Sequence, residues 1–225
     1  MSSVPHLDPR SVTIIIPQYN QPELTIQAIE SLRLVDPIRW PILVADNGSS
    51  PESLRQLHGL GDPDTEVLAL PRQGLTAAWN AAVSRSRTAN LVFLNNDTLS
   101  RGPWVAELLA PVSQGLVGMA GVERRREAHL TPAIDLLSGW CFAVCRETFY
   151  AVHGFDEALS LYFSDTDFQL RVREQGAGSS RAAWVAIPGL PVLHLSHRTA
   201  HRLPDQRACW NADHARFQAR WQKRR

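Results

Sequence analysis

Apolar and polar positions alternate in blocks along the first part of the chain. Short, unbroken apolar runs at 12–16, 42–45, 66–70 and 91–94 predict strands buried on both faces. Between them, helical spacing of apolar residues or a high alanine content predicts helices at 22–35, 51–57 and 75–86. The alternation predicts an α/β fold with a mostly parallel sheet flanked by helices. Ligand-binding side chains are then expected at the carboxyl ends of the strands.

The second part of the chain is less regular. Its pattern predicts strands at 116–122, 136–144 and 184–187 and helices at 146–152 and 166–174. We find no repeat or long linker, so we expect one domain over 11–200. The segment 201–225 places Trp210, His214, Phe217 and Trp221 at near-helical spacing among basic residues, which predicts a basic aromatic helical extension. This helix either docks on the domain, which we favour, forms a dimer contact or touches an anionic membrane surface.

Composition narrows the class of protein. A hydrophobic fraction of 44% over 225 residues supports a sizeable core and excludes a disordered chain. The 23 basic and 22 acidic residues nearly cancel, so nucleic-acid binding is not expected. Three cysteines are too few for a disulfide framework and indicate a reducing compartment. No apolar run suits a signal sequence or a membrane span, so we expect a cytoplasmic protein, with peripheral contact at the inner face of the membrane as an alternative.

Polar side chains gather where three predicted strands end. They form the clusters Pro17-Gln18-Tyr19-Asn20, Asp46-Asn47-Gly48-Ser49 and Asn95-Asn96-Asp97. A nucleotide fits such an edge, because Asp46 can accept a hydrogen bond from a base or ribose and Tyr19 can lie against a flat ring. Helix N-termini at the same edge favour phosphate. Each cluster taken alone is also explained as a strand-ending turn.

Asp97 and His194 are the candidate metal ligands. Both are expected at strand ends, and a carboxylate with an imidazole can hold Mn²⁺ or Mg²⁺. His197 and His201 are rivals of His194, and a lone histidine is often structural.

A second candidate site is Ser164-Asp165-Thr166-Asp167, which precedes a predicted helix. An acid there either caps the helix or projects into a cleft as a general base, and spacing alone does not choose between these roles. Trp140 either presents the apolar face of its ring to a ligand or packs in the core. The run Arg124-Arg125-Arg126 either meets an anionic ligand or, as we favour, forms an exposed charged loop.

Taken together, these segments resemble family 2 glycosyltransferases of the GT-A fold, and are most similar to bacterial rhamnosyltransferase-like members. The resemblance covers 12–196. It is carried by P-x-Y-N at 17–20, V-A-D-N-G-S-S at 44–50, Q-G-L-T-A-A-W-N at 73–80, F-L-N-N-D-T at 93–98, G-F-D-E at 154–157 and Y-F-S-D-T-D at 162–167. Three positions depart from the family pattern: Gln73 replaces the first Asn of N-x-G-x-x-x-A-x-N, Asn95 replaces the first acid of the metal-binding D-x-D, and Ser164 replaces the glutamate of E-D-x-D.

The resemblance implies a nucleotide-diphosphate-sugar donor, a saccharide, lipid-linked or other small acceptor, and Mn²⁺ or Mg²⁺. The donor-binding residues that it implies are Pro17, Gln18, Tyr19, Asn20, Asp46, Asn47, Gly48, Ser49, Gly74, Asn80, Asn95 and Asn96. Asp165 is the implied catalytic base, and Asp97 with His194 the implied metal site. The implied acceptor or sugar contacts are Trp140, Asp156, Glu157 and Asp167.

The expected activity is a single, inverting, metal-dependent sugar transfer. One rival is a sugar-phosphate nucleotidyltransferase, which would normally carry a glycine-rich phosphate loop where this chain has Pro17-Gln18-Tyr19-Asn20. Another is a degenerate, non-catalytic carbohydrate-binding subunit, which the missing acids at Asn95 and Ser164 support. The sequence leaves the nucleotide base, the sugar, the acceptor and the oligomeric state open.

Overall fold

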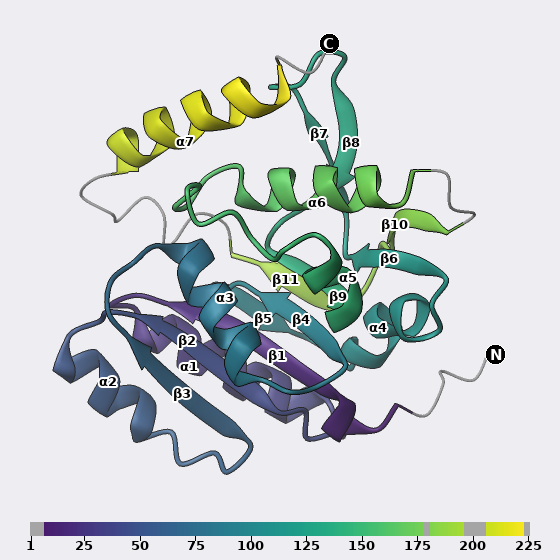
Figure 1. Ribbon diagram of the computed structural model, residues 1–225. Coiled ribbons are helices and arrows are strands. Elements are labelled where there is room, and N and C mark those ends of the chain that lie inside the picture. The colour runs from purple at the N-terminus through teal and green to yellow at the C-terminus, as the bar shows by residue number, and fades with distance from the viewer. Residues whose placement is uncertain (1–6, 178–180, 196–205, 223–225) are drawn as a thin grey trace.

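A seven-stranded sheet lies at the centre of the protein (Figure 1). The computed structural model describes residues 7–177, 181–195 and 206–222. The sheet has the order β10-β6-β9-β4-β1-β2-β3. Its strands are β1 (Val12–Gln18), β2 (Ile42–Asn47), β3 (Thr65–Leu70), β4 (Asn90–Leu94), β6 (Val117–Gly121), β9 (Cys141–Cys145) and β10 (Ala182–Ala186). Neighbours are parallel except at β9, which is antiparallel to β4 and β6, so the predicted mostly parallel α/β sheet is confirmed.

Helices cover both faces of this sheet (Figure 1). On one face pack α1 (Pro22–Val35), α2 (Pro51–His58) and α4 (Val105–Ser113), and on the other α3 (Leu75–Arg85), α5 (Arg146–Ala151) and α6 (Ser164–Gln175). Because successive strand residues face opposite sides, Ile14 and Ile16 enter the first core and Ile15 enters the second. All three side chains are fully buried, as the unbroken apolar run predicts.

Further elements extend the domain. The chain begins with a short 3₁₀ helix, η1 (Pro9–Ser11). Two small antiparallel sheets pair β5 (Thr98–Ser100) with β11 (Val192–His194) and β7 (Arg124–Glu127) with β8 (Ile134–Leu137). The last helix, α7 (Gln206–Trp221), lies on α6 as an outer layer, with Phe217 buried against Phe163 and Leu170. The predicted C-terminal helix therefore docks on the domain by its aromatic face.

The structure corrects two of the predicted segments. The single strand expected at 136–144 is two strands, because the chain turns at 138–140 to leave the β7–β8 pair and enter the central sheet as β9. Arg124-Arg125-Arg126 is not a loop but most of β7. The pattern also gave no indication of β5 or α4.

The described helices include none that is both long and apolar enough to cross a membrane. The cysteines in this part of the chain are free, and Cys141 is fully buried, where burial raises the pKa of its thiol well above the ordinary value. Cys141 therefore acts as a small apolar core residue.

Candidate active site

The ends of β1 and β2 form the first part of the site. Gln18 and Asp46 are register partners at these ends, and Asp46 is fully buried. One Asp46 oxygen, Oδ2, accepts from Gln18 Nε2 at 3.1 Å, and the other, Oδ1, accepts from the Ser49 amide at 3.0 Å. Pro17 stands one residue before Gln18, opposite Ala45. Asp46 was predicted to bind the nucleotide, and both of its carboxylate oxygens accept hydrogen bonds from protein groups. These bonds shape the loop after β2.

The turn after β1 is tied to the turn after β2. The Asn20 amide donates to Ser49 Oγ at 2.8 Å, and the Ser50 amide donates to Asn20 Oδ1 at 2.8 Å. Gly48 has a φ of +81°, and a Cβ there would lie 2.5 Å from the Arg72 backbone nitrogen. Only glycine suits this close approach.

Tyr19 faces Arg72. The guanidinium carbon of Arg72 lies 4.7 Å from the ring centroid, and Nη1 donates to the tyrosine hydroxyl at 3.0 Å. Arg72 therefore places a positive charge beside the predicted nucleotide site, and the sequence analysis did not single it out.

The start of α3 joins this edge. Asn47 Oδ1 accepts from the amides of Gln73 and Gly74, at 2.8 and 3.2 Å, and α3 begins directly after Gly74. Gly74 has a φ of +100°, which favours glycine. The Leu75 amide donates to the Ser160 carbonyl at 2.8 Å. The predicted donor-side segment thus contacts the loop that leads to α6.

Asn80 has a different role from the donor contact that was predicted. Its Nδ2 donates to the Phe155 carbonyl and to Glu157 Oε1, both at 2.9 Å, and its Oδ1 accepts from the Phe155 amide at 3.0 Å. These bonds use both N–H groups of the Asn80 amide and one lone pair of its oxygen, and they hold the 154–157 loop. Glu157 is thereby tied to α3.

The end of β4 brings the predicted metal residues together. Asp97 Oδ1 lies 3.0 Å from His194 Nε2, and Asn95 Nδ2 lies 3.5 Å from the same nitrogen. Pairing of β5 with β11 sets His194 opposite Thr98, which explains this approach between residues far apart in the chain. Asn96 is buried and donates to Thr25 Oγ1 of α1 at 3.2 Å, so it holds the turn. The rival histidines His197 and His201 lie outside the described residues.

The donor atoms of this pair fit Mn²⁺ or Mg²⁺ as part of a shared site. Asp97 offers a carboxylate oxygen and His194 an imidazole nitrogen, and diphosphate oxygens are ligands of the same hard cations. No group of three or more His, Cys, Asp and Glu side chains in the described part of the chain is placed to hold a metal. Among the described residues, Asp97 and His194 therefore offer one oxygen and one nitrogen donor to such an ion.

Trp140 connects the two sides of the site. Its ring stacks on that of His194, with centroids 5.1 Å apart and planes 5° apart. Its Nε1 donates to Glu123 Oε1 at 2.8 Å, and Glu123 also accepts from Ser138 Oγ at 3.0 Å. One face of Trp140 is thus covered by His194, and its indole is held by Glu123.

Asp165 stands in the first turn of α6, with its side chain 19% exposed. Its Oδ2 accepts from Arg125 Nη2 at 2.9 Å, and among the described residues its Oδ1 has no hydrogen-bond partner. A Cβ at Gly139 would lie 2.3 Å from Oδ2, so only glycine allows the carboxylate to sit here. Asp165 therefore lies beside the Gly139-Trp140 turn.

Asp156 and Asp167, two further acids predicted to contact the acceptor or sugar, bind other protein groups. Asp167 is fully buried, with Oδ2 bound to Arg171 Nε at 2.8 Å and Oδ1 bound to Trp221 Nε1 at 2.9 Å. Asp156 accepts from Arg220 Nη1 at 2.8 Å. Both acids therefore join the domain to α7, and the geometry gives Asp167 a structural role rather than the predicted acceptor contact.

Asp213 was not predicted and organises the loop before α6. It is fully buried in α7, and its carboxylate accepts from the backbone amides of Ser160, Leu161 and Tyr162 at 3.0, 2.9 and 2.9 Å. An acid flanked by aromatic positions of a predicted amphipathic helix is the one signal that could have pointed to it.

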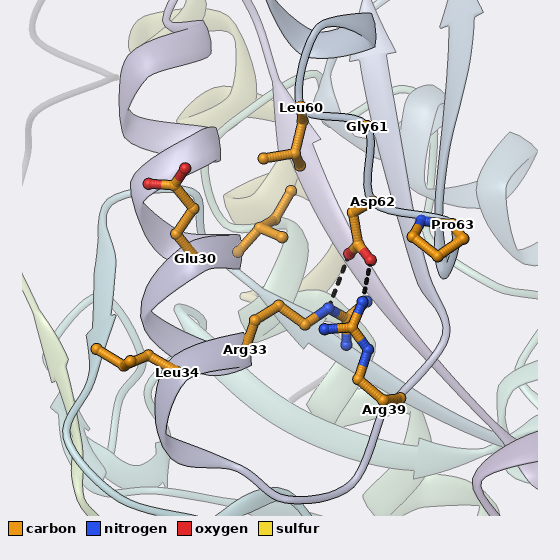
Figure 2. A pocket seen from close by; sticks show the side chains of 9 residues that line it. Glu30, Arg33, Leu34, Arg39, Leu60, Gly61, Asp62 and Pro63 are labelled. Carbon is orange, nitrogen blue, oxygen red and sulfur yellow. Dashed lines mark hydrogen bonds and ion pairs between the residues drawn. The ribbon is translucent and has the colours of Figure 1, made fainter.

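A pocket of about 400 Å³ lies away from these residues, between α1 and the turn before β3 (Figure 2). Figure 2 shows Arg33 and Arg39 both directed at Asp62, and Arg33 Nε is 2.8 Å from Asp62 Oδ2. Burial acts to raise the pKa of Asp62, but hydrogen bonds from Thr65 and Arg33 outweigh it and hold the pKa below the ordinary value. Arg33 and Arg39 are thus both paired with Asp62, which indicates a structural cluster.

Comparison with curated proteins gives distant bacterial relatives. The chain is 26% identical over 255 aligned positions to the uncharacterized protein y4gI of Sinorhizobium fredii (strain NBRC 101917 / NGR234), covering 93% of the chain and 27% of that protein. It is 27% identical over 206 positions to the O-antigen biosynthesis protein RfbC of Myxococcus xanthus, covering 73% of the chain and 16% of RfbC. The chain thus spans less than a third of either relative.

Among solved structures, the protein is similar to the mannosyltransferase PcManGT from Pyrobaculum calidifontis, solved with GDP-Man and Mn²⁺. The TM-score is 0.67 with 20% identity, over 96% of this chain and 66% of that chain. This likeness shows a shared GT-A fold. The sequence model of the family "Glycosyl transferase family 2" matches residues 13–167, which is more than half of the chain. The chain therefore belongs to glycosyl transferase family 2.

Proposed function

We propose that this protein transfers one sugar, with inversion, from a nucleotide-diphosphate sugar to an acceptor hydroxyl. The observation that carries the proposal is that Asp165 and the Asp97–His194 pair both lie against the Gly139-Trp140 turn. On one side, Asp165 lies beside Gly139, and one of its carboxylate oxygens has no partner within the part of the chain that the structure describes. On the other, Trp140 stacks on His194, which is bonded to Asp97. A base and a candidate ion site are thus joined through two consecutive residues.

The donor nucleotide is proposed to bind at the ends of β1 and β2. Tyr19 with Arg72 offers an aromatic ring and a positive charge, and the loops of Asn20, Asp46, Asn47, Gly48 and Ser49 are already held in shape. Preorganised loops reduce the entropy lost on binding. The nucleotide sugar bound to the Pyrobaculum mannosyltransferase supports a donor of this class.

In the proposed reaction, Asp165 acts as the general base. Its free Oδ1 accepts the proton of the acceptor hydroxyl while the acceptor oxygen attacks the anomeric carbon and the bond to the diphosphate breaks. Asp97 and His194 would hold Mn²⁺ or Mg²⁺, which when bound offsets the charge that develops on the leaving diphosphate. The Mn²⁺ in the Pyrobaculum complex supports this requirement.

The acceptor is proposed to approach from the side of α6 and the 154–163 loop. A saccharide or a lipid-linked sugar suits this side, and O-antigen biosynthesis in the name of the Myxococcus relative supports that class of acceptor. Phe217 and Trp221 of α7 face the domain, and Arg220 binds Asp156, so these groups are not available to a membrane surface. Docking is the role of α7 that its contacts support.

The test combines binding with turnover. We expect one of UDP, GDP, dTDP or CDP to raise the melting temperature, and more so with Mn²⁺, since a ligand at about 100 times its Kd adds about 2.7 kcal/mol to stability. The matching nucleotide sugars are then assayed for nucleotide release. Asp165→Asn should lower turnover on the order of 10² to 10⁴-fold and leave nucleotide affinity unchanged.

The matched control is Asp135→Asn, which removes an exposed carboxylate on β8 that pairs with Arg126 on β7. It should leave turnover unchanged. Nucleotide binding without release from any donor would favour a non-catalytic subunit. An Asp165→Asn enzyme with normal turnover would move the base elsewhere.

A further inference from the structure

We infer that Arg125 is a positioning residue, which holds one oxygen of Asp165 so that the other is presented to the acceptor hydroxyl. The inference rests on the proposed function, because it assigns a role relative to the proposed base. Arg125 lies on β7, which the sequence analysis took for an exposed charged loop. The other role weighed for the run 124–126 was contact with an anionic ligand, and neither role involved Asp165.

The contacts of Arg125 converge on the first turn of α6. Nη2 donates to Asp165 Oδ2 at 2.9 Å and to Thr166 Oγ1 at 2.5 Å, while Nη1 donates to Glu127 Oε2 at 2.7 Å. The guanidinium is planar and rigid, so its bonds to Glu127 and Thr166 fix the direction from which it binds Asp165 Oδ2. A single-point cation such as lysine cannot make the same set.

The buried carboxylate of Glu127 holds Arg125 in position. Glu127 is 2% exposed, and its carboxylate also accepts from the His129 amide at 3.0 Å and from Thr166 Oγ1 at 3.1 Å. Although burial acts to raise the pKa of Glu127, the His129 amide and Arg125 hold it below the ordinary value, so Glu127 stays ionised. The charge of Asp165, followed by that of Glu127, raises the pKa of Arg125 above its ordinary value despite burial of the guanidinium. The Arg125 guanidinium therefore stays protonated at neutral pH.

The carboxylate is also confined from the opposite side. The carboxylate lies so close to Gly139 that a Cβ there would clash with it, so the 138–140 turn lies against this side of Asp165. With Oδ2 held by Arg125, the remaining lone pairs on Oδ1 are the ones that an acceptor can use. Orientation of this kind is worth large factors in rate, because misplacement by about 1 Å can cost on the order of 10²-fold.

Strand alternation supplies a matched control. Arg125 and Glu127 face α6, whereas Arg126 faces the other way, is 62% exposed and pairs with Asp135. Arg126→Ala therefore removes the same charge from the same strand without touching Asp165.

The experiment measures nucleotide release from the donor sugar that the wild-type protein uses, together with Kd for the corresponding nucleotide. Arg125→Ala should lower kcat on the order of 10²-fold with KM for the donor and nucleotide Kd unchanged. The kcat of Arg125→Lys should lie between those of the wild type and Arg125→Ala, since lysine keeps the positive charge but not the planar set of donors of the guanidinium. Added methylguanidinium should restore part of the activity of Arg125→Ala, because the side chain is 35% exposed and its place is open to solvent. Arg126→Ala should match the wild type.

A double-mutant cycle isolates the positioning role from a structural one. If Arg125 acts through Asp165, Arg125→Ala costs no further activity in the Asp165→Asn background, whereas an independent structural effect adds to it. Arg125→Lys serves where Arg125→Ala, which leaves Glu127 buried without its cation, fails to fold.

The outcomes separate the two proposals. An active wild-type protein whose Arg125→Lys and Arg125→Ala variants turn over normally, or lose activity additively with Asp165→Asn, overturns the role of Arg125 alone. A folded wild-type protein that releases nucleotide from no donor overturns the proposed function and this role with it.

Discussion

The carboxylates around the candidate site differ in how much of their hydrogen-bonding capacity the protein itself uses. Asp46, Asp167 and Asp213 are fully buried, and both oxygens of each are bound by protein groups. Buried carboxylates of this kind stabilise loops, because unpaired burial of a charge is costly. Among the described residues, no protein group binds the second oxygen of Asp165, and Asp97 is paired with an imidazole. We therefore propose that the chemistry falls to Asp165 and Asp97.

This division makes Asp97→Asn informative. We expect the variant to weaken nucleoside-diphosphate binding in the presence of Mn²⁺ on the order of ten- to a hundredfold, because a neutral amide oxygen is a poorer ligand for a hard cation than a carboxylate. Binding without metal should not change. Calorimetric titrations with and without Mn²⁺ measure both values, and Asp135→Asn is the control. Equal Mn²⁺-dependent affinity in the variant would place the ion away from the end of β4.

At the scale of elements, α7 and the 154–163 loop behave as one unit. Asp213 gathers three consecutive loop amides, Arg220 binds Asp156, and Trp221 binds Asp167. The same loop meets α3 through the Ser160 carbonyl and leads directly into Asp165. The C-terminal helix therefore sets the path of the segment that joins the donor side to the proposed base.

Asp213→Ala tests this coupling. Loss of the carboxylate leaves three loop amides without their acceptor, so we expect the free energy of unfolding to fall by about 3 kcal/mol. Urea unfolding measures the change, and hydrogen exchange at 160–162 should rise with it. Asn211→Ala, at an exposed position of the same helix, is the control and should leave the midpoint almost unchanged. An unaltered urea midpoint for Asp213→Ala would mean that α7 does not stabilise the loop.

The elements also show why sequence reasoning succeeds in one part and not in another. The strands and helices from 12 to 94 were predicted to within two residues, because long apolar runs and helical spacing report burial directly. β5 and β7 are short, and β7 consists of three arginines and a glutamate, so their strand character comes from pairing with distant partners. The clustering of polar residues could be predicted, because the carboxyl ends of parallel strands lie at one edge of the sheet. The approach of Arg125 to Asp165 and of Asp213 to Ser160 joins residues 40 and 53 positions apart, which no local pattern encodes.

At the scale of the whole molecule, charge is used differently in two regions. The candidate active site keeps Asp165 partly exposed beside Arg125, whereas the cluster between α1 and the turn before β3 pairs nearly buried charges with one another. In that cluster Arg33 also donates to the Trp40 carbonyl at 2.8 Å, so it ties α1 to the segment that enters β2. These ion pairs contribute to stability rather than to chemistry.

The pH dependence of unfolding follows from the Asp62 cluster. The pKa of Asp62 is lower in the folded protein than its ordinary value of 3.8, so folding favours the ionised carboxylate. The stability that this carboxylate contributes is fully present above pH 3.8 and is lost as the pH falls through the lower, folded-state pKa. Asp62→Asn should therefore lower the free energy of unfolding by about 1 to 3 kcal/mol at pH 7, with the gap to wild type closing in strong acid. Urea unfolding at several pH values measures the gap, and Glu52→Gln, which breaks an exposed pair with Arg55, should show little change at neutral pH. A gap of constant size down to the acid transition would show that the ionised Asp62 does not stabilise the fold.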